Sequence, residues 1–169
     1  GYDTAPADGK RVQLEMGGKN PIVVSDSADV AEAASIVAGG AFGVTGQACT
    51  ATSRAIVYED VYDEFVEAVV AEAEAIEPGA GLAGGEMGPQ VSESELEGTL
   101  DYVTVGKQEG ATLETGGEAI DREGYFVEPT VFADVNADSR IAQEEIFGPV
   151  LSVIPVGGYD EALAVANGV

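Results

Sequence analysis

Cys49 is the only cysteine among the 169 residues, and small and polar residues surround it rather than an apolar run. Gly46 frees the backbone just before it, and Gln47 and Thr50 offer hydrogen-bonding groups beside it. A thiol does chemistry as a thiolate, which needs a positive environment or a nearby base. A lone cysteine is more commonly a small buried hydrophobe. The stretch Thr45–Arg54 alone therefore leaves a nucleophile and a buried filler both open.

A carboxylate that could serve as the base, Glu15, lies nearer the N-terminus. Residues 11–15 alternate polar and apolar side chains, which predicts a strand. Paired glycines at 17 and 18, followed by Pro21, predict a sharp turn directly after it. We therefore expect Glu15 at the carboxyl end of a strand, where α/β proteins build sites. A solvated carboxylate at a strand end fits the same pattern, so position alone assigns no role.

Segments with strand character alternate with helical segments through the rest of the chain. Short strands are expected at 21–24, 54–58 and 150–156. Helices are expected over 28–42, after a capping Asp60, after a capping box of Ser92 and Glu95, and from 159 onward. This alternation predicts an α/β fold with an open, mostly parallel sheet and flanking helices.

The charge of the chain is strongly negative. Seven Lys and Arg stand against 31 Asp and Glu, which gives a net charge of −24. Nucleic acids and anionic membranes would repel such a protein, so we expect neither as a partner. The carboxylates are spread along the whole sequence rather than gathered in a tail. An even acidic coat with few lysines resembles the surfaces of halophilic proteins; an ordinary acidic protein is the alternative.

The single cysteine forbids an internal disulfide, which is consistent with a reducing cytoplasm, and we expect a cytoplasmic location. No signal-like segment and no apolar run of about 20 residues is present, so we expect no membrane insertion. The sequence starts at Gly1 rather than Met and stops at Val169 within a helical pattern. From these ends we expect a piece of a longer chain.

The absence of histidine removes several chemistries from this piece. It excludes Cys-His and Ser-His-Asp nucleophilic sites and zinc sites that need imidazole. One cysteine excludes cysteine-rich metal and redox motifs, and we expect no metal site. Residues 17–20, Gly-Gly-Lys-Asn, are not a phosphate-binding loop. What remains is one thiol and a carboxylate that can act as a base.

Three segments together resemble the aldehyde dehydrogenase superfamily. They are Leu14–Pro21 (LEMGGKNP), Gly46–Cys49 (GQAC) and Glu144–Pro149 (EEIFGP). All three occur in the family's order and at its usual separations, and the resemblance spans essentially the whole chain. It implies the catalytic-domain fold of that family and oxidation of an aldehyde to an acid with NAD or NADP.

The resemblance also implies a role for each matching residue. Cys49 matches the family's nucleophile and Glu15 its general base. Glu145 matches the glutamate that binds a cofactor ribose, and Phe147 the aromatic residue beside the nicotinamide. Met16 matches the residue whose backbone lies by the nicotinamide ring. A thiolate adds to an aldehyde carbon, and a carboxylate can activate the water that later releases the acid.

The same resemblance implies what this piece lacks. Residues 1–169 correspond to a partial catalytic domain without the cofactor-binding domain and the C-terminal remainder. We expect the isolated piece to be inactive and the full-length protein to be a homo-oligomer. The sequence of the motifs is most similar to the branch acting on 2-oxoglutarate semialdehyde (2,5-dioxopentanoate), while the succinate semialdehyde and general aldehyde branches stay open. The choice between NAD and NADP stays open as well.

Two alternatives come from other functional classes. A nitrilase-like hydrolase uses Glu, Lys and Cys, and Glu15, Lys19 and Cys49 supply those types. Such an enzyme needs no nicotinamide, so reduction of NAD would distinguish the two. A non-catalytic relative that keeps the fold as a binding module is the second alternative.

Overall fold

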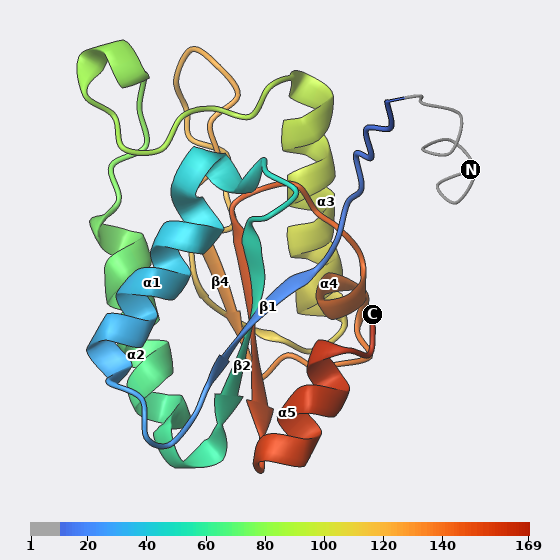
Figure 1. Ribbon diagram of the computed structural model, residues 1–169. Helices are drawn as coiled ribbons and strands as arrows, with labels where there is room; N and C mark the ends of the chain where they lie inside the picture. Colours follow the sequence, from blue (N-terminus) through green and yellow to red (C-terminus); the bar gives the residue numbers. More distant parts are fainter. Residues whose placement is uncertain (1–10) are drawn as a thin grey trace.

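The computed structural model describes residues 11–169, and a five-stranded sheet lies at its centre (Figure 1). The strands are β1 (Asn20–Val24), β2 (Thr52–Tyr58), β3 (Thr112–Thr115), β4 (Thr130–Ala133) and β5 (Val150–Val156). Their order across the sheet is β1-β2-β5-β4-β3, and every neighbouring pair is parallel except β3 with β4. The predicted open, mostly parallel sheet is confirmed.

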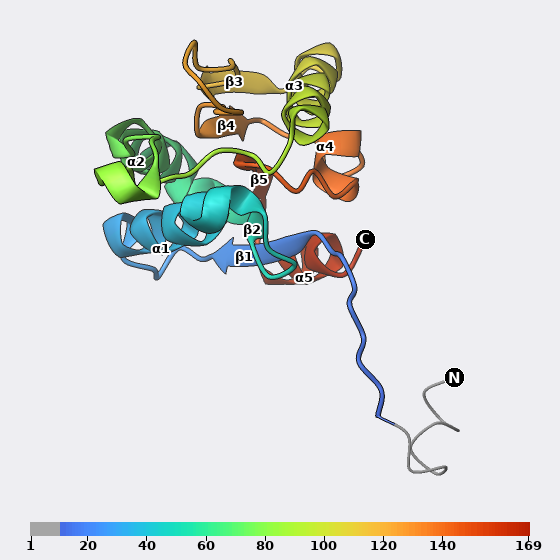
Figure 2. The ribbon, with the colours of Figure 1, turned by 90° about the horizontal axis from the view of Figure 1, so that it is seen from above.

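Helices cover both faces of the sheet, as its edge-on view shows (Figure 2). On one face lie α1 (Val30–Phe42) and α2 (Tyr62–Ala75). On the other lie α3 (Glu93–Gln108), α4 (Arg140–Gln143) and α5 (Tyr159–Ala166). Short 3-10 turns occur at η2 (Gly43–Gly46), η3 (Glu59–Val61) and η4 (Gly81–Ala83). The two layers of helices leave only the ends and edges of the sheet open to loops.

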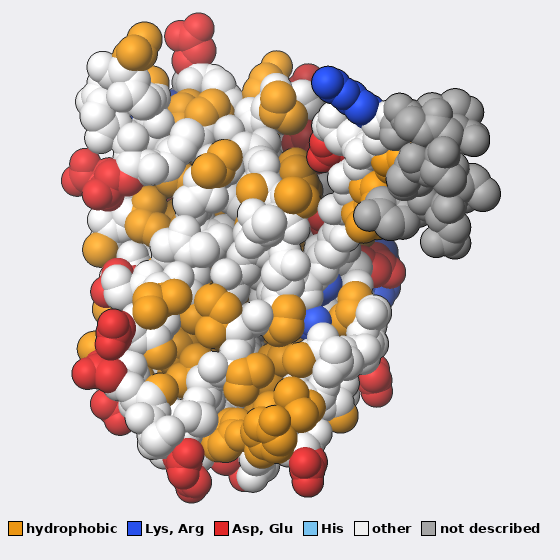
Figure 3. All heavy atoms as spheres, in the orientation of Figure 1, with side chains coloured by type: hydrophobic (Ala, Val, Ile, Leu, Met, Phe, Trp, Pro, Cys, Tyr) orange, Lys and Arg blue, Asp and Glu red, His pale blue; other side chains and the backbone are white. Residues whose placement is uncertain are grey.

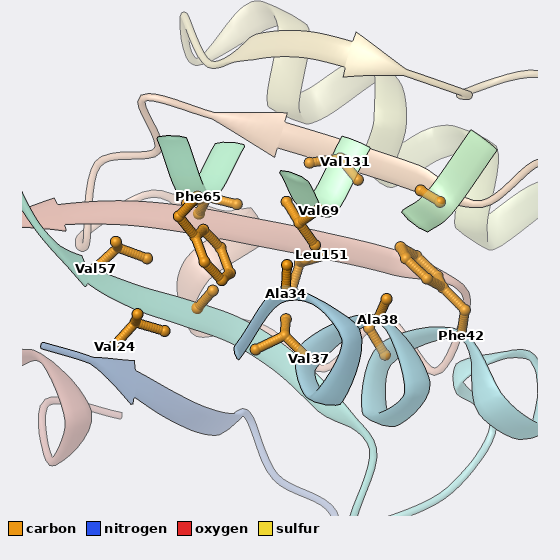
Figure 4. Close-up of a cluster of buried hydrophobic side chains, with 14 of the residues drawn as sticks. Val24, Ala34, Val37, Ala38, Phe42, Val57, Phe65, Val69, Val131 and Leu151 are labelled. Atoms are coloured by element: carbon orange, nitrogen blue, oxygen red, sulfur yellow. The ribbon is translucent and has the colours of Figure 1, made fainter. Parts of the chain in front are cut away.

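The sequence of β5 shows why both faces must be covered. Leu151 and Val153 point into the core under α1 and α2, whereas Ile154 packs in the core under α3 and α4. Figure 4 shows the first core, in which small side chains of α1 such as Ala34 and Ala38 let the helix approach the strands. Each fully buried Val, Leu or Phe stabilises the fold by about 1.5–3 kcal/mol relative to an exposed one.

Two of the predicted helix starts can be compared with the structure. Ser92 caps α3 as expected, because its hydroxyl accepts a hydrogen bond from the Glu95 amide at 3.3 Å. The prediction that Asp60 caps α2 is wrong. Asp60 lies within η3, and this 3-10 turn moves the start of the helix to Tyr62, where Val61 is an N-cap without a side-chain hydrogen bond.

The predicted strand at residues 11–15 is also wrong. These residues are exposed and irregular, and they run away from the folded body toward the N-terminal end (Figures 1 and 2). An alternating pattern becomes a strand only where another strand pairs with it. Within residues 11–169 no strand pairs with this segment, and the pairing of β1 with β2 begins only at Asn20.

The surface reflects the acidic composition. Figure 3 shows acidic side chains scattered around the edges of one face rather than collected in one patch. Apolar side chains gather in the lower half of the same view. No helix among residues 11–169 combines the length and apolar character needed to cross a membrane.

Candidate active site

Three loops from the quoted sequence motifs meet at one end of the sheet. Residues 17–19 precede β1, residues 46–51 precede β2 and residues 145–149 precede β5. These strands are parallel neighbours, so the loops before them lie together at the amino-terminal ends of the strands, at the upper end of the sheet in Figure 1. The expectation of a site at the carboxyl end of a strand is therefore wrong. It depended on a strand at residues 11–15 that does not form.

The chain approaches Cys49 through a left-handed stretch of backbone. Val44, Thr45 and Gly46 have φ of 53°, 60° and 66°. This conformation costs an L-residue roughly 1–2 kcal/mol, and it is unusual for β-branched residues. Gly46 also has no room for a side chain, because a Cβ there would lie 2.2 Å from the carbonyl oxygen of Gly148. Surrounding structure therefore holds a strained backbone directly before the thiol, a feature typical of functional sites.

Cys49 itself occupies a short turn. The amide of Ala51 donates to the carbonyl of Ala48 at 2.9 Å, which closes the turn with Cys49 as its second residue. Cys49 is exposed, so the interpretation of this cysteine as a buried filler is wrong. Among the hydrogen bonds of residues 11–169 none uses the amide of Cys49. The turn therefore offers an accessible thiol and a backbone donor at the same residue.

Two side chains that the sequence analysis did not assign hold this turn. Gln47 donates from Nε2 to the carbonyl of Pro89 at 3.1 Å and accepts at Oε1 from the amide of Val91 at 2.9 Å. Asn20 donates from Nδ2 to the carbonyl of Cys49 at 2.8 Å. Both residues lie inside the motifs quoted above. Their types signalled hydrogen bonding, but only the fold shows which carbonyl groups they meet.

Glu145 and Phe147 line the site opposite the Cys49 turn. The amide of Gly18 donates to Oε1 of Glu145 at 3.2 Å, and a Cβ on Gly17 would lie 2.0 Å from Oε2 of the same carboxylate. Phe147 has φ of 57° and is 40% exposed. A cavity of about 20 Å³, room for about one water molecule, lies between segments 46–53 and 145–150. The structure thus brings Glu145 and Phe147 to the turn that carries Cys49.

Two cations are buried behind these loops. Lys19 is 4% exposed, and its Nζ has no hydrogen-bond partner among the described residues. Burial and the nearby Arg54 guanidinium lower the pKa of Lys19 from 10.5 to about 7, although the Glu145 and Glu144 carboxylates oppose the shift. Arg54 donates from Nε to the carbonyl of Lys19 at 2.9 Å and from its other nitrogens to two carbonyls ending α5, at 2.9 and 3.1 Å. These bonds tie the loop before β1 to the other side of the sheet.

Glu15 and Met16 lie in the exposed segment before the glycine turn. The carboxylate of Glu15 accepts a hydrogen bond from the side chain of Gln13, and Met16 is 71% exposed. No hydrogen bond within residues 11–169 joins either residue to the Cys49 turn. The roles of Glu15 as a base and of Met16 beside a nicotinamide therefore stay predictions.

The types of residue at the site are suited to binding the nicotinamide and ribose end of a dinucleotide. A carboxylate such as Glu145 accepts hydrogen bonds from sugar hydroxyls, and the exposed ring of Phe147 offers a face for a flat ring. Gly17 keeps the space that the Glu145 carboxylate fills. In the part of the chain that the structure describes, no three His, Cys, Asp or Glu side chains are grouped so as to hold a metal ion.

The sequence matches the model of the family described as "Aldehyde dehydrogenase family" over residues 2–169. It is 61% identical to the alpha-ketoglutarate semialdehyde dehydrogenase of Haloferax volcanii, over 99% of this chain and 36% of that protein. It is 47% identical to the alpha-ketoglutaric semialdehyde dehydrogenase of Bacillus subtilis, over 98% of this chain and 35% of that protein. The chain therefore spans about a third of the length of the curated relatives it matches.

Solved structures show the same fold. A 1-pyrroline-5-carboxylate dehydrogenase from Thermus with bound NAD superposes with a TM-score of 0.88 at 45% identity, covering 90% of this chain and 30% of that one. The NAD⁺ complex of aldehyde dehydrogenase from Bacillus cereus gives a TM-score of 0.89 at 42% identity, covering 98% of this chain and 34% of that one. At these identities the likeness extends to sequence as well as fold.

Proposed function

The chain belongs to the aldehyde dehydrogenase family, and from that premise we propose that the whole protein oxidises an aldehyde to a carboxylic acid with NAD or NADP. Residues 1–169 would supply part of its catalytic domain. The observation that carries the proposal is the position of Cys49, an exposed thiol on a turn whose Ala48 and Ala51 line the same cavity as Glu145 and Phe147. We assign Cys49 as the nucleophile and Glu15 as the general base.

The proposed reaction begins with addition of the Cys49 thiolate to the aldehyde carbon. This forms a carbon–sulfur bond and places negative charge on the former carbonyl oxygen, giving a thiohemiacetal. The amide of Cys49 is a donor suited to that oxyanion. A nicotinamide, when bound, would supply the acceptor for the hydride that leaves this carbon. Glu145 and Phe147 would hold the ribose and the ring, with Met16 contributing its backbone.

Loss of the hydride leaves a thioester on Cys49. Water then adds to the thioester carbon, the carbon–sulfur bond breaks, and the carboxylic acid and the thiolate are released. Glu15 would take the proton from that water, because a carboxylate placed near the thioester is a suitable general base. Among residues 11–169 Glu15 hydrogen-bonds to Gln13 alone, so this role requires the exposed segment to lie over Cys49 in the whole protein.

The proposed substrate is the semialdehyde of 2-oxoglutarate. Support comes from the names of three relatives, the alpha-ketoglutarate semialdehyde dehydrogenase of Haloferax volcanii, its counterpart in Bacillus subtilis and the 2,5-dioxopentanoate dehydrogenase of Saccharolobus solfataricus. A 1-pyrroline-5-carboxylate dehydrogenase of Bacillus pumilus is 49% identical, so related semialdehydes are the competing substrates. We further propose NAD as cofactor, following the bound NAD of the Thermus structure. We also propose that the whole protein is cytoplasmic and forms a homo-oligomer.

The test is to supply the whole protein with 2-oxoglutarate semialdehyde and to follow the absorbance of reduced nicotinamide. We expect reduction of NAD in step with formation of acid, at a higher kcat/KM than with succinate semialdehyde. The same assay with NADP decides the cofactor. Acid formed from a nitrile without nicotinamide reduction would favour the nitrilase-like hydrolase. Absence of both turnover and NAD binding would favour a non-catalytic module.

A further inference from the structure

Asn20, the first residue of β1, reaches across to the turn that carries the thiol. Its Nδ2 donates to the carbonyl of Cys49 at 2.8 Å and to the carbonyl of Ala51 at 3.0 Å. We propose that Asn20 is a positioning residue, which fixes the Cys49 turn so that the thiol and the amide of the same residue face one reacting carbon. The inference rests on the function proposed above.

An irregularity in strand pairing accounts for this reach. Asn20 pairs with Thr52 but Pro21 pairs with Arg54, so Ser53 is an extra residue on β2. Proline lacks an amide hydrogen and cannot take part in a regular ladder as a donor. Such bulges re-aim neighbouring side chains and occur beside active sites. Here the irregularity lies at the first residue of β1, whose side chain meets the Cys49 turn.

The chemistry of the contact requires a primary amide. The NH₂ group of asparagine has two hydrogens, and each has its own carbonyl acceptor here. An aspartate has the same shape but would set a carboxylate oxygen against two carbonyl oxygens. A serine is one bond shorter and has one hydroxyl hydrogen, so it could keep at most one of the two bonds. Substitutions at this position therefore give a graded series of two, one and no hydrogen bonds.

Asn20 and Gln47 hold different parts of the turn. Gln47 ties its start to residues 89–91, and Asn20 ties its middle and end to β1. Without Asn20, the backbone of residues 49–51 would keep the bond from Ala51 to Ala48 alone among the turn and loop hydrogen bonds of residues 11–169. The turn would then sample other conformations, and an error of about 1 Å in placing a reacting group costs on the order of 10² in rate.

The test compares Asn20→Ala, Asn20→Asp and Asn20→Ser in the whole protein. Asn167→Ala is the matched control, because Asn167 Nδ2 also donates to a backbone carbonyl, that of Leu163 at 2.8 Å, in α5. We expect kcat about 10²-fold lower in Asn20→Ala and Asn20→Asp and intermediate in Asn20→Ser. The KM for NAD and the rate of Cys49 alkylation by iodoacetamide should stay within about threefold of the unsubstituted protein, since neither needs an aligned turn.

Hydrogen exchange provides a readout that is independent of catalysis. Amides of residues 48–53 should exchange about tenfold faster in Asn20→Ala than in the unsubstituted protein or in Asn167→Ala. If the unsubstituted protein oxidises no aldehyde, the proposed function fails, and the exchange result still decides whether Asn20 holds the turn. If kcat and exchange in both Asn20→Ala and Asn20→Ser match those of Asn167→Ala, Asn20 is not a positioning residue.

Discussion

The amide of Gly18 donates a hydrogen bond to Oε1 of Glu145 at 3.2 Å, although 127 positions separate the two in the sequence. The contact joins the loop before β1 to the loop before β5 at the amino-terminal ends of these strands. It depends on Gly17, whose missing side chain leaves the space that the Glu145 carboxylate occupies. Two of the three recognised motifs therefore meet through one carboxylate.

Gly17→Ala should weaken NAD binding without unfolding the protein. A new Cβ would lie 2.0 Å from Oε2 of Glu145, and the flexible end of that side chain would have to move. We expect an increase of about tenfold in the Kd for NAD, measured by titration of the whole protein. The reason is that the displaced carboxylate of Glu145 would lose one hydrogen bond to the ribose of the cofactor. Gly39→Ala in α1 is the control, since among the described residues no atom beyond its chain neighbours and its own helix backbone lies within 4 Å of the added Cβ. Equal NAD affinity in the two variants would contradict a role for Glu145 in cofactor binding.

Cys49→Ala should abolish aldehyde oxidation, by on the order of 10⁴-fold or more, while NAD binding stays close to normal. The reason is that Cys49 is proposed to form the covalent bond with the substrate, and no other thiol occurs among these 169 residues. Steady-state turnover and NAD titration of the whole protein are the measurements. Iodoacetamide should inactivate the unsubstituted enzyme by labelling Cys49, and mass spectrometry locates the label. Substantial oxidation by the alanine variant would overturn the assignment.

Glu15→Gln should slow release of the acid more than transfer of the hydride. If Glu15 activates the water that attacks the thioester, its loss removes a general base worth about 10²–10⁴ in rate. Rapid mixing should then show a burst of reduced cofactor followed by a slow steady state. A proportional fall of burst and steady rates would mean instead that Glu15 acts earlier, for example on the thiol.

Much of this arrangement could be predicted from the sequence. Apolar periodicity placed α1, β2 and β5 to within a few residues, because burial on both faces of a parallel sheet constrains those segments strongly. Three sequence motifs also predicted the residues of the site. Cys49 is exposed, and Glu145 and Phe147 line a small cavity together with Ala48 and Ala51 of its turn.

The remaining features depend on contacts between distant segments. Residues 11–15 have a strand pattern but no partner strand within residues 11–169, so the pattern alone predicted a strand that does not form. The hydrogen bonds of Asn20 to the Cys49 turn depend on an extra residue in β2, which no local pattern indicates. The burial of Lys19 could not be predicted from the sequence either, since a lysine between a glycine turn and a strand is normally solvated.

Lys19 should make stability depend on pH. Its pKa falls from 10.5 to about 7 on folding, chiefly through burial, so between these values the unfolded chain binds a proton that the folded chain does not. The contribution of Lys19 to the free energy of unfolding is thus fully present above about pH 10.5 and is lost as pH falls through about 7. Lys19→Met should be more stable at pH 7, by at most on the order of 4 kcal/mol, with the difference shrinking toward pH 10.

Denaturant unfolding of the whole protein across that pH range is the measurement for Lys19. Lys107→Met is the control, because Lys107 is an exposed lysine on α3. Its stability relative to the unsubstituted protein should change little with pH. A constant difference between Lys19→Met and the unsubstituted protein from pH 7 to pH 10 would show that the amine of Lys19 is solvated.

The last prediction concerns salt and follows from 31 carboxylates against seven basic side chains. The acidic residues are spread along the sequence, and on the face that Figure 3 shows their side chains are scattered, so repulsion is not confined to one cluster. At low ionic strength charges within about 10 Å of one another are poorly screened, and the compact state bears more of that cost than the unfolded chain. Salt shortens the screening length to about 3 Å at 1 M.

An ordinary acidic protein should gain stability modestly and reach a plateau at moderate salt, where screening is nearly complete. A halophilic protein should continue to gain stability and activity into molar KCl, and this is the outcome that we expect. Thermal unfolding midpoint and turnover of the whole protein should therefore both rise from low salt to molar KCl. The same series with potassium glutamate controls for effects of chloride. Highest activity in dilute buffer, with loss in molar KCl, would refute the halophilic interpretation and leave the assignment to the aldehyde dehydrogenase family unchanged, because that assignment depends on sequence and fold rather than on surface charge.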